Sequence, residues 1–338
     1  MLNIGIIGFG FMGRMHYRCW KDAGGAEIVA ICDANPDVLK NTDKSAGNIE
    51  GAEEKIDFDG LQLYTDVKAM LADANLDAVS ITLPTFMHSK FSIMALEAGM
   101  HVLCEKPMAL GAGQCQQMIA AAEKSGKILQ IGHCIRFWPE YAKAKEIVDS
   151  GEYGKVIAAT FERLGSAPTW GAENWFANDQ RSGGVALDLH IHDSDFIQYL
   201  FGMPTSVCSF GNPRSAEGLK HITTRYSYDD DKLVTADGSW AMAPSFGFEM
   251  SFNIVMEKAT IVYDCTRQPA FKVCPADGQV STPQVAKGDG YTLQIEYFTG
   301  LINGEKPAQV TTLDQSLDSI RLVNAEVESV RKNSEIEL

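Results

Sequence analysis

The first residues carry three closely spaced glycines directly after a short apolar run. Residues 2–7 form a short apolar run, typical of a buried parallel strand, and Gly8-Phe9-Gly10-Phe11-Met12-Gly13 follows directly. We expect a helix over 14–23 and a second strand over 27–32, with Asp33 at the tip of that strand. This order of strand, glycine turn, helix, strand and acid predicts one half of a nucleotide-binding α/β domain.

Each glycine of this turn has a physical reason. Gly8 would allow the tight turn, Gly10 would let the backbone approach a pyrophosphate, and Gly13 would let helix and strand pack closely. The helix N-terminus then offers free N–H groups and a positive dipole to the phosphates. Asp33 would accept both ribose hydroxyls and repel a 2′-phosphate, and residues 34–36 contain no Arg to hold one. The pattern therefore favours NAD over NADP; the alternative is a glycine turn that binds no dinucleotide.

The first 125 residues continue to alternate strands and helices. Strands are expected over 61–64, 78–83, 101–104 and 127–131, and helices over 67–72, 89–98 and 113–124, with a polar, helix-like stretch over 35–60. Asp66 is expected to cap one helix and Gly99 to end another. This alternation predicts a doubly wound parallel sheet, whose ligands sit at the carboxyl ends of the strands. Pro84 and Lys106 fall at such ends, as Asp33 does.

Beyond residue 150 the pattern changes to strands separated by polar turns. Strands are expected over 156–164, 206–210, 223–228, 234–240, 248–256 and 259–263, with helices over 184–200, 292–303 and 313–332. We therefore expect an NAD-binding Rossmann domain over 1–125. An α+β substrate-binding and oligomerisation domain with a large, mostly antiparallel open sheet is expected over 126–338, and its last helix could pack back on the first domain.

Charge and composition exclude several classes of function. The 338 residues carry a net charge of −15 and no basic run, which argues against nucleic acid and anionic membranes as partners. No apolar stretch approaches the roughly 20 residues that cross a bilayer. The first strand begins at residue 2, so no signal peptide is expected. The eight cysteines are scattered without a C-x-x-C pair, which is typical of free thiols in a reducing cytoplasm.

Two sets of residues could carry chemistry. Glu105-Lys106-Pro107 stands at a strand tip, where Lys106 is either a solvated surface lysine or a lysine held at the nicotinamide end of a cofactor. Asp188 and His192 are four residues apart on the helix expected over 184–200, so they share a face. A carboxylate in that place could orient the imidazole as a general base for a hydroxyl proton.

The same helix allows two other interpretations. It could be a polar face with capping acids, or His190, His192 and nearby acids could form a metal site. A metal site fits a strand better than a helix, because residues two apart on a helix point in different directions. We expect no metal.

Several motifs in the right order resemble one family. They are residues 8–13, Leu83-Pro84-Thr85-Phe86-Met87-His88, the run from Ala95 to Pro107, Arg136-Phe137-x-Pro139 and Asp188-x3-His192-Asp193. Together they resemble the Gfo/Idh/MocA family of nicotinamide-dependent sugar and polyol oxidoreductases. The resemblance implies oxidation of a secondary ring hydroxyl of a sugar or cyclitol, with Lys106, Asp188 and His192 catalytic and His192 as the base. The family often has glycine where His190 stands.

The resemblance also suggests which residues bind. The cofactor is expected to contact Gly8, Phe9, Gly10, Phe11, Met12, Gly13, Asp33, Leu83, Pro84, His88, Glu105 and Lys106. Polar or aromatic residues expected to reach the substrate are Arg136, Arg163, Trp170, Trp175, Asn178, His190 and Tyr291.

Other functions remain open at this stage. One is a redox-assisted glycosidase, which would borrow and return the hydride. Another is a non-catalytic NAD-sensing regulator, although Lys106 and His192 are both present. The exposed face of the second domain's sheet predicts a homodimer or homotetramer.

Overall fold

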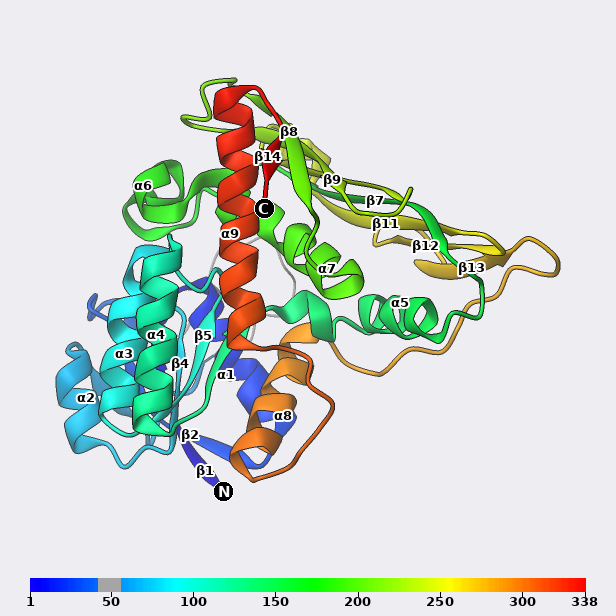
Figure 1. The fold of residues 1–338 in the computed structure, drawn as a ribbon. Helices are drawn as coiled ribbons and strands as arrows, with labels where there is room; N and C mark the ends of the chain where they lie inside the picture. The colour runs from blue at the N-terminus through cyan, green and yellow to red at the C-terminus, as the bar shows by residue number, and fades with distance from the viewer. Residues whose placement is uncertain (42–55) are drawn as a thin grey trace. The chain divides into compact units, whose positions relative to one another are not determined.

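The computed structural model describes residues 1–41 and 56–338 (Figure 1). The chain divides into two compact units, and both are discontinuous in sequence. Unit 1 comprises Met1–Phe137, Thr169–Trp175 and Asp289–Leu317, and unit 2 comprises Trp138–Pro168, Phe176–Gly288 and Asp318–Leu338. The single domain boundary that the sequence analysis places at residue 125 stays a prediction.

Unit 1 is built on a parallel sheet of six strands. Across the sheet they are β3 (Gln62–Tyr64), β2 (Ala26–Cys32), β1 (Leu2–Ile7), β4 (Ala78–Ile81), β5 (His101–Glu105) and β6 (Leu129–Gly132). β1 and β4 are buried over most of their length, which explains their nearly continuous apolar runs. The strand order reverses between β1 and β4, the place where doubly wound sheets bind ligands. The predicted doubly wound parallel sheet is confirmed.

Helices cover both faces of this sheet, as right-handed connections require (Figure 1). On one face lie α2 (Val67–Asp73), α3 (His88–Glu97) and α4 (Ala112–Ser125), and on the other α1 (Phe11–Ala23) packs against α8 (Gly290–Ile302). Asp66 caps α2 by accepting a hydrogen bond from the N–H of Ala69 at 2.9 Å, and Gly99 follows α3 with φ +87°, both as predicted. Most of the helix-like stretch predicted over 35–60 lies outside the described residues.

Unit 2 is built on a sheet of eight strands. Across the sheet they are β13 (Phe271–Pro275), β12 (Ala259–Asp264), β11 (Phe248–Met256), β7 (Val156–Gly165), β10 (Leu233–Ser239), β9 (His221–Ser227), β8 (Ser206–Asn212) and β14 (Ile336–Glu337). Only the pairing of β7 with β10 is parallel, so the predicted mostly antiparallel sheet is confirmed. Strands β13 and β14 and helix α5 (Pro139–Ser150) were not predicted.

The helix predicted over 184–200 is present, but it contains a π-helical turn, η5 (Ala186–His190), that runs into α7 (Ile191–Phe201). A separate short helix, α6 (Asp179–Ser182), precedes it and ends at Gly183. Gly183 and Gly184 have φ values of +77° and +65°, which glycine adopts readily and which separate α6 from the helix that follows. The last helix, α9 (Leu313–Lys332), has the predicted bounds.

The core of unit 2 contains a buried ion pair under α7. Arg163 of β7 donates from Nε and Nη2 to the two carboxylate oxygens of Asp193, at 2.8 and 3.0 Å. Tyr141 of α5 packs on Phe196 of α7 with ring centroids 4.9 Å apart, and its hydroxyl lies 3.3 Å from the Arg163 guanidinium. Both charged groups are 2% exposed or less, so each depends on the other for compensation.

Replacing Asp193 with Ala should therefore lower the free energy of unfolding by about 3–5 kcal/mol, because Arg163 would keep a buried charge without its carboxylate. Urea unfolding followed by circular dichroism measures this change. The control is Asp149→Ala, which removes an exposed pair with Lys145 at 2.6 Å and should cost about 0.5 kcal/mol or less. Equal losses in the two variants would contradict the buried-pair interpretation.

Candidate active site

The glycine turn at the end of β1 has the geometry that the sequence predicts. Gly8 has φ +90°, and a Cβ on Gly13 would lie 2.2 Å from the Gly8 carbonyl oxygen. The helix can therefore approach the strand only because position 13 is glycine. A Cβ on Gly10 would meet no atom within 4 Å. That open space above the backbone of Gly10 is where a pyrophosphate would lie.

Asp33 closes this turn from the tip of β2. Its Oδ2 accepts a hydrogen bond from the N–H of Phe9 at 2.8 Å, and its Oδ1 accepts one from the N–H of Asn35 at 2.8 Å. Each carboxylate oxygen can accept further hydrogen bonds, so both remain suited to ribose hydroxyls. The first turn of α1 has no side-chain cap and no acidic residue, which leaves its N–H groups and its dipole for phosphate. These residues fit NAD.

The side chains around the glycine turn differ in burial and in what they contact. Phe9 is fully buried and packs on Tyr17 and Phe58, with ring centroids 6.0 and 5.8 Å away, so only its backbone faces the turn. Arg14 lies over the Phe9 ring at 5.3 Å and donates to the carbonyl oxygen of Asn41 at 2.6 Å. Phe11 and Met12 are half-buried at the start of α1.

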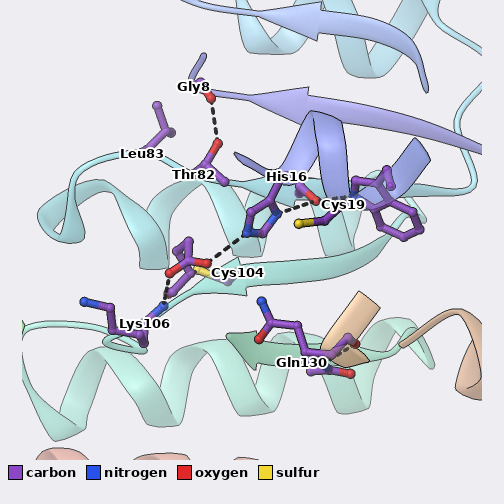
Figure 2. Close-up of polar contacts among 12 residues, drawn as sticks. Gly8, His16, Cys19, Thr82, Leu83, Cys104, Lys106 and Gln130 are labelled. Atoms are coloured by element: carbon purple, nitrogen blue, oxygen red, sulfur yellow. Dashed lines mark hydrogen bonds and ion pairs between the residues drawn. The ribbon is translucent and has the colours of Figure 1, made fainter. Parts of the chain in front are cut away.

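The tips of β4 and β5 are tied to each other and to the glycine turn. Thr82 donates from its hydroxyl to the Gly8 carbonyl oxygen at 2.6 Å (Figure 2). The two ring nitrogens of His88 each lie 2.7 Å from a carbonyl oxygen, those of Pro107 and Leu83. Burial lowers the pKa of His88, although these carbonyl contacts act to raise it. His88 therefore holds the turn of Leu83 and Pro84 against the turn that carries Lys106.

A buried chain of hydrogen bonds supports Lys106 from behind. His16 of α1 contacts Glu105 through Nε2 and Oε1 at 2.9 Å, and the N–H of Lys106 lies 3.3 Å from Glu105 Oε2 (Figure 2). The Lys106 side chain extends away from this buried chain, as Figure 2 shows. Burial raises the pKa of Glu105, but the contact with His16 and the nearby Lys106 outweigh it and leave that pKa below its usual value.

The chain continues into the core of unit 1. Trp20 donates from Nε1 to Ser80 Oγ at 2.8 Å, and Ser80 Oγ lies 3.1 Å from Nδ1 of His16. If the Ser80 hydroxyl donates to Nδ1 of His16, the hydrogen of the neutral imidazole is on Nε2. That N–H can then donate to the Glu105 carboxylate. Sequence reasoning missed His16 and Ser80. The signal available was a histidine three residues after Gly13, between the apolar Met15 and Tyr17 on a helix expected to pack against the sheet.

The two sets of expected catalytic residues lie in different units. Lys106 is part of unit 1, whereas Asp188 and His192 are part of unit 2. Asp188 lies within the π-helical turn η5, and His192 lies in the first turn of α7; both are half-buried. Among the described residues, no three His, Cys, Asp or Glu side chains are grouped to hold a metal ion.

His190, a predicted substrate contact, is fully buried in unit 2. Its Nε2 lies 3.3 Å from the carboxylate of Glu326 on α9 and 3.3 Å from the hydroxyl of Tyr226 on β9. Burial lowers the pKa of His190, but Glu326, together with Asp193 and Asp237, more than offsets this and raises that pKa above its usual value. These contacts assign the side chain to the interior of unit 2.

The two predicted arginines are also engaged inside their units. Arg136 is 1% exposed and donates to the carbonyl oxygen of Val310 at 2.9 Å and to Gln315 Oε1 at 2.5 Å. Arg163 forms the ion pair with Asp193. Both guanidinium groups therefore have structural partners, which weakens the case that they contact substrate.

The remaining predicted substrate residues are spread over both units. Trp170 is half-buried in unit 1, where its ring centroid lies 6.4 Å from that of Phe11 in the glycine turn. Trp175 is half-buried and Tyr291 is buried in α8, both also in unit 1. Asn178 is exposed in unit 2 and caps α6 by accepting from the N–H of Gln180 at 3.0 Å.

The pKa of Glu105 gives a pH-dependent prediction. Because that pKa is lowered in the folded state, ionised Glu105 stabilises the protein above about pH 4.5, and the stabilisation is lost as the pH falls through the folded-state pKa. Glu105→Gln should lower the free energy of unfolding by about 1–3 kcal/mol at pH 7, and the difference from wild type should shrink as the pH falls below about 4.5. Urea unfolding at several pH values measures it.

The control is Glu97→Gln on the exposed surface of α3, which should change the free energy of unfolding by about 0.5 kcal/mol or less. A difference between wild type and Glu105→Gln that stays constant with pH would contradict the assignment.

Comparison with known proteins identifies the two domains. An oxidoreductase family with an NAD-binding Rossmann fold matches residues 2–133, and the Gfo/Idh/MocA C-terminal domain matches residues 141–262. All eight cysteines lie among the described residues, and none of them forms a disulfide. No helix within 1–41 and 56–338 is both long and apolar enough to cross a membrane.

Individual relatives act on sugars and cyclitols. The 2,7-anhydro-N-acetylneuraminate hydratase of Mediterraneibacter gnavus is 30% identical over 229 residues, covering 68% of this chain and 56% of that protein. The inositol 2-dehydrogenase of Rhizobium meliloti is 27% identical over 354 residues, covering 100% of this chain and 99% of that protein. The chain therefore spans about half of some relatives and nearly all of others.

The fold is shared with levoglucosan dehydrogenase solved with NADH and levoglucosan, at a TM-score of 0.81 and 20% identity over 99% of this chain and 98% of that one. With both domain models matched in order along the chain, the protein belongs to the Gfo/Idh/MocA family of NAD-binding oxidoreductases.

Proposed function

We propose that this oxidoreductase is an NAD-dependent dehydrogenase that oxidises a secondary ring hydroxyl of a sugar or cyclitol. The observation that carries the proposal is the edge of the parallel sheet in unit 1. There the open glycine turn, Asp33 and the supported Lys106 all stand at carboxyl ends of strands. The relatives named for inositol and anhydrosugar chemistry support the substrate class.

Each catalytic residue has a distinct role in the proposal. NAD, when bound, accepts a hydride from the carbon that bears the hydroxyl. His192 takes the hydroxyl proton as general base, and Asp188 orients its imidazole. Lys106 donates a hydrogen bond to the substrate oxygen and stabilises the negative charge that develops there. Glu105 and His16 keep the backbone of Lys106 in place.

The preference for NAD over NADP rests on Asp33. Its two oxygens already hold the turn through Phe9 and Asn35, so the carboxylate is fixed where a ribose would bind. A 2′-phosphate at that place would face a fixed negative charge. Trp170 contributes to the cofactor side of the site in this proposal, because it packs on Phe11 of the glycine turn.

A redox-neutral reaction is the second candidate. The relative named as a hydratase of an anhydrosugar favours it, because that name describes no net oxidation. In such a reaction the hydride returns to the product, and free NADH does not accumulate. The homo-oligomer and the cytoplasmic location expected from the sequence stay predictions.

The test is a screen for NADH absorbance with inositols, aldoses, sugar acids, anhydrosugars and glycosides. We expect one substrate class to reduce NAD, and Lys106→Ala to lower kcat on the order of 100- to 1,000-fold while the Kd for NAD stays within about twofold. Lys124→Ala, on the exposed end of α4, is the control and should keep wild-type kcat. Wild-type turnover in Lys106→Ala would overturn the role of that lysine.

The screen also separates the two candidates. Chromatography of the products detects conversion of a substrate that releases no NADH. Conversion of an anhydrosugar or glycoside in this way would favour the redox-neutral reaction over the dehydrogenase. Retained NAD binding with no conversion of any substrate would refute both.

The glycine turn gives a second prediction, on NAD affinity alone. Gly10→Ala should raise the Kd for NAD by about tenfold or more, because its methyl group would occupy the open space above the turn. The same variant should unfold at nearly the wild-type temperature, since no atom lies within 4 Å of the added Cβ. Calorimetric titration with NAD and thermal unfolding measure the two effects.

Gly13→Ala provides the contrast. Its Cβ would meet the Gly8 carbonyl oxygen at 2.2 Å, so it should destabilise the protein by about 1–3 kcal/mol. Unchanged NAD affinity in Gly10→Ala would contradict the cofactor position.

A further inference from the structure

We propose that His190 is a positioning residue that anchors the π-helical turn η5, and through it sets the relative orientation of Asp188 and His192. This inference rests on the proposed function, because those two residues are its catalytic pair. It concerns a residue that does not touch substrate, since the His190 side chain is fully buried.

The first step of the argument is the turn itself. π-Helical turns are rare because an extra residue interrupts the regular hydrogen-bond ladder. They occur mostly as single turns within α-helices, frequently at functional sites. η5 contains Asp188 and ends at His190, and α7 begins with Ile191 and His192. The geometry of this turn therefore determines how the carboxylate of Asp188 stands relative to the imidazole of His192. Such a turn needs contacts from outside to hold it.

His190 supplies those contacts to three other elements of unit 2. Its Nε2 reaches Glu326 of α9 and Tyr226 of β9, each at 3.3 Å. On β10, Gly238 lies directly against the ring, because a Cβ there would be 2.7 Å from the Cβ of His190 and 2.8 Å from its Nδ1. The imidazole is thus enclosed by a helix and two strands, and position 238 must be glycine to admit it.

Ser194 completes the anchor one turn further along α7. Its hydroxyl donates to Glu326 Oε1 at 2.9 Å and lies 3.1 Å from the Tyr226 hydroxyl. His190 and Ser194 therefore share both partners and fix the junction of η5 and α7 to α9, to which Ser319 of α9 adds a hydrogen bond to Asp195 of α7. Glu326 is 0% exposed. Asp193 and Asp237 are the other acids whose negative charges raise the pKa of the His190 imidazole.

Kinetics test the positioning. His190→Ala should lower kcat on the order of 100-fold with the KM for NAD unchanged, because a displacement of about 1 Å in a catalytic pair has that effect. His190→Gln, which can still reach Tyr226 or Glu326, should keep more activity. The matched control is Thr224→Val, which removes a buried hydroxyl contact with Ser209 at 2.8 Å on the same strand as Tyr226 and should keep wild-type kcat.

A double-mutant cycle separates positioning from a general loss of stability. If His190 acts through the catalytic pair, His190→Ala should lower kcat little or not at all in an Asp188→Asn background. Wild-type kcat in His190→Ala, or an equal fall of kcat in both backgrounds, would overturn the proposal.

Hydrogen exchange tests the anchor without any substrate. Amides over residues 186–192 should exchange faster in His190→Ala than in wild type or Thr224→Val, as mass spectrometry of peptides would show. Gly238→Ala should also speed exchange of these amides, because its Cβ would clash with the His190 ring. In the double variant with His190→Gly, that clash is absent. Unchanged exchange in His190→Ala would refute the anchor, whatever the activity of the wild type. Absence of activity with every substrate would refute the proposed function and leave the exchange test of the anchor valid.

Discussion

The contact between His16 and Glu105 is the interaction on which the nucleotide-binding unit depends. It joins α1, which starts at the glycine turn, to the tip of β5, which carries Lys106. A buried carboxylate is costly unless it is hydrogen-bonded, so the pair forces these elements into one arrangement. Ser80 and Trp20 extend the same constraint to β4 and the core. The glycine turn and Lys106 are thereby held at one edge of the sheet.

Local rules made much of that edge predictable. The glycine turn can be predicted from residues that are close together in sequence. Gly8, Gly13 and Asp33 lie where the motif places them. Capping is equally local, so the start of α2 at Asp66 and the bounds of α9 agree with prediction. The family resemblance rests on the same local motifs, and both domain models confirm it.

What the sequence could not show is which polar residues are buried together. His190 was expected to contact substrate, yet its side chain is buried and its partner Glu326 lies more than a hundred residues away. Arg163 and Asp193 are likewise distant in sequence, and nothing in either local pattern links them. The π-helical turn was invisible for a related reason, since its residues have no pattern that distinguishes them from an α-helix. Such features depend on tertiary contacts.

These buried polar residues of unit 2 share one location, the segment that carries Asp188 and His192. Arg163 holds Asp193, Ser319 donates to Asp195 at 2.7 Å, and Glu326 accepts from Ser194. An apolar helix face would have packed on the sheet with a smaller desolvation penalty. Each buried charge loses its hydration, and its hydrogen-bond and ionic partners must offset that loss. Non-directional apolar packing leaves a helix free to slide or rotate slightly, whereas hydrogen bonds at fixed positions do not. The polar interior of unit 2 therefore holds the helix that carries Asp188 and His192, the proposed catalytic pair, in one register.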